Sequence, residues 1–244
     1  MRHHFKLMVV WAVLSIFSAC SNKSDFPQVR ETASKGWFPL ATDEAAGIIY
    51  DETDFPVVGI AAGMLADDVE RITGKRPEIL PYTDLNDMPE VPAILAGTVG
   101  RSRIIDELVT RGLVDVSEIS GKWESSLITT VRLQGRDKPV LVIAGSDRRG
   151  TAYGLTSLSE AIGVSPWYWW ADVTPQPRKA LYVEPGCFTQ GEPSVQYRGI
   201  FINDERFGGW SRWAEQTFDK ESGKVGPKTY QKVFELLLRL KGNL

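Results

Sequence analysis

The sequence predicts an α/β fold in which helices cover a mixed β-sheet over residues 36–184. Short apolar runs typical of buried strands alternate loosely with segments whose apolar residues recur at helical spacing. A further apolar run at 200–202, followed by a helical pattern at 230–240, predicts one more strand–helix unit. Prolines and glycines between residues 185 and 193 predict a linker between the two parts.

The elements of the first part follow from apolar spacing and from proline and glycine signals. One helical stripe has Pro56 near its first turn and Gly74 at its end. A second stripe ends at Gly112 in the same way. Residues 181–183 are expected to add an edge strand. We expect strands at 47–50, 93–96, 127–133, 140–144 and 181–183, and helices at 61–72, 104–109 and 151–162.

The stretch that follows the linker carries the clearest functional signal. Residues 200–202 form a continuous apolar run, as expected for a strand covered on both faces, and the run ends in Asn203, Asp204 and Glu205. Side chains at the carboxyl end of such a strand face the active site in α/β enzymes. One amide and two carboxylates suit polyol recognition and acid–base chemistry. A strand that simply ends in an Asx-type turn is the alternative interpretation.

The last predicted helix is strongly apolar. Its apolar residues follow helical spacing from 230 to 240, and Gly242 stands where a C-cap glycine belongs. Such a helix needs partners that cover it, yet the sequence stops at Asn243 and Leu244, where a next strand would begin. We therefore expect the chain to be truncated.

The loop at 145–151 has the glycine spacing of a phosphate loop. That loop also needs a lysine before its hydroxyl residue, whereas here Gly150 is followed directly by Thr151. A structural loop in which Ser146 or Asp147 caps the following helix is the better interpretation.

Four consecutive aromatic residues at 167–170 could contact sugar rings or could form an apolar wedge between two domains. Neighbouring residues of an extended chain point in opposite directions, so four rings cannot form one flat platform, and the wedge is favoured. Trp210 and Trp213 fit two roles equally well. They could line a sugar subsite, or they could cover the top of a helix.

The N-terminus has the pattern of a signal peptide of the lipoprotein type at residues 1–19. Arg2 and Lys6 precede an apolar run at 7–17, which is shorter than the roughly twenty residues that span a membrane. The residues at 17–20 resemble a bacterial lipobox, with a phenylalanine where leucine is usual, and Cys20 would be lipidated. Residues 20–35 then form a tether. We expect an exported lipoprotein of the periplasm or outer membrane, attached to the membrane only through Cys20; a buried N-terminal helix is the alternative.

Charge and residue usage exclude several functions. The net charge of the whole chain is −3, and loss of the two positive charges in residues 1–19 makes it −5, which argues against nucleic-acid binding. His3 and His4, the two histidines, both lie in residues 1–19. The remaining chain therefore has no Ser-His-Asp triad and no histidine-based zinc site. We expect carboxylate chemistry and no metal site, and glycoside hydrolysis is the main precedent for such chemistry.

Four segments together resemble glycoside hydrolase family 115, the xylan α-glucuronidases. The resemblance covers most of residues 36–244 in the right order. It is carried by residues 143–154, 163–173, 193–199 continuing into 203–205, and 234–243.

The resemblance implies an N-terminal α/β domain at 36–184, a linker at 185–193, and a (β/α)8 (TIM) barrel of which 194–244 supply only the first strand and helix. It implies an inverting hydrolase that removes glucuronic acid or 4-O-methylglucuronic acid from xylan side chains, without a cofactor, using glucuronoxylan or its oligosaccharides as substrate. The main acid and base would lie beyond Leu244, so that this chain alone is inactive.

Within this segment, the resemblance implies that Asp204 holds ring hydroxyls and takes a catalytic part. Asn203 would assist Asp204. Glu205 is a further candidate for substrate binding, with a side chain turned away from the pocket as the alternative. Trp210 is a candidate because it follows closely and could line a sugar subsite. The stretch 206–210 departs from many family members, which leaves the neighbouring subsite undefined. Two other functions remain open: a non-catalytic surface glycan-binding lipoprotein module, and a related barrel hydrolase such as a hexosaminidase.

Overall fold

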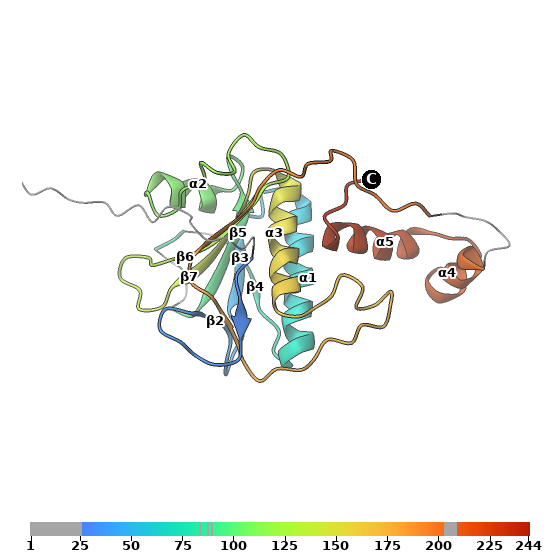
Figure 1. The fold of residues 1–244 in the computed structure, drawn as a ribbon, viewed down its shortest axis with the longest axis horizontal. Helices are drawn as coiled ribbons and strands as arrows, with labels where there is room; N and C mark the ends of the chain where they lie inside the picture. The colour runs from blue at the N-terminus through green and yellow to red at the C-terminus, as the bar shows by residue number, and fades with distance from the viewer. Residues whose placement is uncertain (1–25, 83, 87, 89, 203–208) are drawn as a thin grey trace, which may run out of the picture.

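A computed structural model describes residues 26–202, except 83, 87 and 89, and residues 209–244. The described part forms a mixed α/β fold with two β-sheets (Figure 1). The strands are β1 (Val29–Arg30), β2 (Phe38–Ala41), β3 (Gly47–Tyr50), β4 (Ile79–Pro81), β5 (Ala93–Thr98), β6 (Ser126–Val131), β7 (Val140–Gly145), β8 (Leu181–Val183) and β9 (Cys187–Gln190). The helices are α1 (Pro56–Thr73), α2 (Arg103–Thr110), α3 (Arg148–Ala161), α4 (Trp210–Phe218) and α5 (Pro227–Arg239).

The larger sheet has the order β4-β3-β5-β7-β6-β9. Strands β4, β3, β5 and β7 are parallel, whereas β6 is antiparallel to both of its neighbours. Helices α1 and α3 cover one face and α2 covers the other. Successive residues of β5 alternate between these layers: Ile94 packs with the α1 and α3 side, and Leu95 packs with the α2 side.

The strands and helices predicted within 36–184 are present, and the structure adds elements that were not predicted. Residues 181–183 do not extend the main sheet. They form the middle strand of a small antiparallel sheet with the order β1-β8-β2. Strand β1 lies within the expected tether, and β9 lies within the expected linker. Both are short edge strands of two and four residues, too short for an alternating pattern to reveal them.

The strand expected at 200–202 is not formed. Phe201 is 90% exposed, and residues 194–202 pair with neither sheet. A barrel strand needs neighbours on both sides to satisfy its backbone groups, and no described segment provides them. The barrel unit at 194–244 is therefore not seen among residues 194–202 and 209–244.

The predicted apolar helix is α5, which packs against α3 on the side away from the sheet (Figure 1). The preceding helix α4 was not predicted. Helix α5 ends at Arg239, and Lys241, two residues further on, has the left-handed φ of 56° that was expected of Gly242. The amide of Gly242 donates to the carbonyl of Leu237 at 2.7 Å, which closes the helix end. Gly242 is needed for space, since a Cβ there would lie 2.9 Å from Cδ2 of Leu237 and 3.2 Å from the carbonyl oxygen of Arg198.

In the part of the chain that the structure describes, no helix is both long enough and apolar enough to cross a membrane.

Candidate functional site

Most of the predicted site residues lie outside the described part of the chain. This applies to Asn203, Asp204 and Glu205, and to the predicted lipidation site Cys20. Trp210, predicted to bind substrate, is described and begins helix α4. The segments on either side of 203–208 therefore define the surroundings of the candidate site.

An apolar pocket of about 330 Å³ lies beside these segments. It brings Trp210 together with Phe201 and with Trp167 and Trp170 of the aromatic run. Val233 and Leu236 of α5 form part of the wall. The pocket is built from rings and aliphatic side chains, so its own lining offers stacking surface but few hydrogen-bonding groups for a sugar.

The aromatic run at 167–170 contacts the C-terminal helices. Trp169 packs against Trp213 and Phe218 of α4, with ring centroids 6.0 and 5.2 Å apart. Tyr168 donates a hydrogen bond to Glu235 of α5 at 3.0 Å. These contacts agree with the wedge interpretation, because the rings join the first part of the chain to the second. Trp213 packs against Trp169 and Trp170 of the aromatic run, whereas Trp210 lines the pocket.

The loop at 145–151 is structural. Asp147 caps α3, and its Oδ1 accepts hydrogen bonds from the amides of Arg149 and Gly150 at 2.9 and 2.8 Å. A Cβ at Gly145 would lie 2.0 Å from the amide nitrogen of Thr151. The glycines thus allow close packing of backbone, and the helix N-terminus is occupied by the chain's own carboxylate.

Two buried acids that the sequence did not single out, Asp51 and Asp54, follow the carboxyl end of β3. The carboxylate of Asp51 accepts hydrogen bonds from Nε and Nη2 of Arg103 at 2.6 and 3.1 Å. The hydrogen bond from Arg103 holds the pKa of Asp51 far below its usual range. Asp54 accepts the amide of Thr98 at 2.7 Å. Burial raises the pKa of Asp54. Since the oxygens of both acids bond to the protein itself, this end of the sheet is filled rather than open.

The Asp51–Arg103 pair gives a pH-dependent prediction. A carboxyl whose pKa is depressed on folding stabilises the fold above its unfolded pKa, about 3.9, and this stabilisation is lost as the pH falls toward the folded pKa. Arg103→Gln should therefore lower the urea midpoint at pH 7. The difference from the wild type should shrink below about pH 4, as Asp51 becomes protonated in the unfolded chain.

The measurement is urea unfolding at pH 7, 5, 4 and 3. Arg76→Gln is the matched control, because Arg76 pairs with Asp67 and Glu70 at the surface, where ion pairs contribute about 0–1 kcal/mol. A difference between Arg103→Gln and wild type that stayed constant down to pH 3 would contradict the role of the ion pair.

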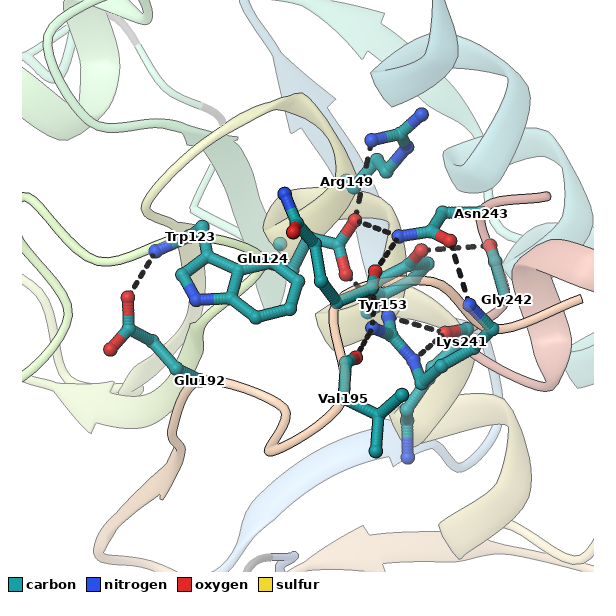
Figure 2. Close-up of polar contacts among 12 residues, drawn as sticks. Trp123, Glu124, Arg149, Tyr153, Glu192, Val195, Lys241, Gly242 and Asn243 are labelled. Atoms are coloured by element: carbon teal, nitrogen blue, oxygen red, sulfur yellow. Dashed lines mark hydrogen bonds and ion pairs between the residues drawn. The ribbon is translucent and has the colours of Figure 1, made fainter.

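A second polar cluster surrounds Glu124, which precedes β6 (Figure 2). Glu124 is 3% exposed and has a left-handed φ of 50°. Its Oε1 accepts hydrogen bonds from Nδ2 of Asn243 at 2.9 Å and from Nη1 of Arg149 at 3.3 Å. Its Oε2 pairs with Nη2 of Arg198. Glu124 therefore binds the chain at both sides of the segment 199–242.

Tyr153 of α3 adds a hydrogen bond from an uncharged group to the cluster around Glu124. Its hydroxyl donates to the carbonyl of Gly242 at 2.8 Å (Figure 2). The side chain is 1% exposed, and burial raises its pKa to about 12. The hydroxyl is therefore a neutral hydrogen-bond donor across the ordinary pH range.

A third cluster joins α5 to α1. Arg239 donates to Oδ2 and Oδ1 of Asp68 at 2.6 and 3.1 Å, and both residues are buried. Arg239 also donates to Glu235 at 3.1 Å and lies over the ring of Tyr168 at 4.9 Å. Although burial opposes it, the hydrogen bond and the charge of Asp68 raise the pKa of Arg239. Nothing in the local sequence signals this pair, because its members are 171 positions apart.

Among the described residues, no group of three or more His, Cys, Asp and Glu side chains is arranged to hold a metal ion.

Comparison with known proteins indicates the class of protein that the chain resembles. The family model for glycosyl hydrolase family 115 matches residues 190–244. A solved structure matches with a TM-score of 0.70 and 34% sequence identity, over 84% of this chain and 25% of that chain. It is described as a family GH115 4-O-methyl-α-glucuronidase, BtGH115A, with specificity for decorated arabinogalactans. The chain is thus related to the glycoside hydrolases.

More particularly, the resemblance to glycoside hydrolase family 115 is confirmed. The chain spans about a quarter of the length of the solved member. The structure of CpGH84D matches at 12% identity with a TM-score of 0.45, over 90% of this chain and 36% of that chain, which is too distant to indicate a common fold. No protein with a curated description matches the chain.

Proposed function

We propose that the chain is part of a glycoside hydrolase that removes glucuronic acid or 4-O-methylglucuronic acid from polysaccharide side chains. The observation that carries the proposal is the 34% identity with a 4-O-methyl-α-glucuronidase over 84% of the chain. The proposed substrate is glucuronoxylan or its oligosaccharides, and the proposed mechanism is inverting. In such a mechanism one carboxylic acid protonates the leaving oxygen while a carboxylate about 6.5–9.5 Å away activates water.

We further propose that the protein is an exported lipoprotein attached through Cys20, and that the 244-residue chain alone is inactive. An eight-stranded barrel cannot close from one strand and one helix. The exposed position of Phe201 supports this, since an inward-facing barrel position would be covered.

The test begins with the DNA beyond the codon for Leu244. If the reading frame continues there, the longer protein that it encodes should release uronic acid from glucuronoxylan. The 244-residue chain should release none. Arabinogalactan that carries 4-O-methylglucuronic acid is the second substrate, because the solved relative is described as a 4-O-methyl-α-glucuronidase with specificity for decorated arabinogalactans. A stop codon directly after Leu244, combined with xylan binding by the chain, would favour a glycan-binding module. Release of N-acetylhexosamine would indicate a hexosaminidase.

Asp204→Ala in the longer protein tests the predicted site residue. If Asp204 holds ring hydroxyls and takes part in catalysis, release of uronic acid should be lost while the melting temperature barely changes. A fall in melting temperature with a proportionate loss of activity would instead assign Asp204 a structural role.

A further inference from the structure

We propose that Glu124 is a positioning residue, which fixes where the chain leaves the first part of the fold and enters residues 199–202. Its importance for catalysis rests on the proposed function; its effect on the conformation of the chain does not. Glu124 itself lies outside the segment that the family model matches, 190–244, but it binds residues of that segment at both ends.

The backbone of Glu124 adopts a left-handed conformation, which residues other than glycine rarely adopt. Its φ is 50°, and its amide donates to Oδ2 of Asp147 at 2.9 Å. Asp147 is also the cap of α3, so the backbone of Glu124 is tied to the start of that helix. A non-glycine residue in a left-handed conformation persists only where its surroundings hold it, and such residues concentrate at functional positions.

The carboxylate of Glu124 pairs with the guanidinium of Arg198, most of whose hydrogen-bond donors are already used. Arg198 donates from Nε and Nη2 to the carbonyl of Lys241 at 2.9 and 2.7 Å, and from Nη1 to the carbonyl of Val195 at 2.8 Å. Nη2 also donates to the carboxylate of Glu124. Arg198 therefore joins the chain before residue 199 to the chain after α5, and Glu124 ties both to α3.

Asn243 completes the arrangement (Figure 2). Its Nδ2 donates to Glu124 at 2.9 Å, its Oδ1 accepts the amide of Arg198 at 3.0 Å, and its own amide donates to the carbonyl of Arg198 at 2.7 Å. The two ends of the segment 199–242 are thus paired with each other and held by one buried carboxylate. A shift of Arg198 would be transmitted to residues 199–202 over at most four peptide units.

The first experiment compares hydrogen exchange in this chain and in Glu124→Gly. Glycine keeps the left-handed backbone without strain, so this variant removes the carboxylate and leaves the turn intact. The amides of Asn243 and Leu244, which both donate to the carbonyl of Arg198, should exchange roughly tenfold faster. Amides of the buried strand β7 should be unchanged. Glu124→Gln, which keeps an acceptor oxygen without the charge, should fall between Glu124→Gly and the wild type.

Glu160→Gln is the matched control. Glu160 lies on α3 and faces Lys241 at 4.0 Å, but its side chain is 53% exposed. Its replacement should leave hydrogen exchange unchanged both at Asn243 and Leu244 and in β7. Unchanged exchange of Asn243 and Leu244 in Glu124→Gly would overturn the proposal, and so would equal acceleration in β7, which would show a general loss of stability.

The second experiment uses the longer protein from the test of the proposed function. In Glu124→Gln, kcat should fall about tenfold while KM changes little, because misplaced groups weaken transition-state contacts more than ground-state binding. If Glu124→Gln has the same kcat as the wild type, the residue has no importance for catalysis. A wild type that releases no uronic acid would refute the proposed function instead, and the exchange experiment would still decide the conformational role of Glu124.

Discussion

Replacement of Arg239 by alanine is expected to lower the free energy of unfolding by about 3 kcal/mol. Asp68 is 0% exposed, and Arg239 makes a two-point contact with it at 2.6 and 3.1 Å. Removal of Arg239 leaves the buried carboxylate of Asp68 with too little compensating positive charge, and water does not reach it to solvate it. Arg71 still pairs with Asp68 at 2.6 Å, which keeps the expected loss near the lower end of the range of 3–5 kcal/mol for broken buried pairs.

The measurement is urea unfolding followed by circular dichroism and by tryptophan fluorescence. Fluorescence reports on all the tryptophans, among them Trp169 and Trp213, which touch where the aromatic run meets α4. Arg239→Lys should also destabilise, because an ammonium group cannot reproduce the two-point contact. Arg76→Ala, at an exposed pair, should cost less than about 1 kcal/mol. A cost of Arg239→Ala equal to that of Arg76→Ala would show that the buried pair contributes nothing to docking of α5.

Replacement of Gly150 by alanine is expected to lower the free energy of unfolding by about 2–3 kcal/mol. A Cβ at this position would lie 2.2 Å from the carbonyl oxygen of Ser125 and 3.2 Å from its amide nitrogen. Both are backbone atoms, so relief requires α3 to move away from the start of β6. Such movement would also disturb the cap, since the amide of Gly150 donates to Asp147 at 2.8 Å.

Gly63→Ala is the matched control for Gly150→Ala. Gly63 is also a helical glycine, in α1, but a Cβ there would meet nothing within 4 Å. Because alanine has the higher helix propensity, this change should stabilise the protein by roughly 0.5–1 kcal/mol. Chemical denaturation of both variants measures the contrast. If both substitutions changed the free energy of unfolding in the same direction, the packing argument would be contradicted.

Local patterns were enough to predict four of the six strands of the main sheet, β3, β5, β6 and β7, and the helices that cover it. The runs that became β5 and β7 are buried throughout, and an uninterrupted apolar run of that length is what a doubly covered strand requires. The stripe that became α1 has a proline at its start and Gly74 at its left-handed end, with a φ of 72°. A cap at Ser146 or Asp147 was predicted for the same reason, since capping depends on residues within one turn, and Asp147 is the residue that caps α3.

Predictions that depended on distant partners were less successful. The run at 200–202 has the composition of a buried strand, yet composition does not supply the neighbouring strands that a barrel position needs. Strand β8 was predicted correctly as a strand, but it joined a different sheet, because pairing depends on β1 and β2. Of the predicted site residues, Trp210 alone lies in the described part, where it lines an apolar pocket.

The sequence by itself determined the α/β class, the positions of the principal elements and the relation to glycoside hydrolase family 115, because each depends on local residue patterns or on long shared strings. Only the tertiary structure decided that α5 is held to α1 by Arg239 and Asp68, and that Glu124 binds both ends of the segment 199–242. Glu124 and Asn243 are 119 positions apart, and Asp68 and Arg239 are 171 apart. Contacts over such separations leave no periodic trace in a single sequence, since they depend on where folding places each side chain.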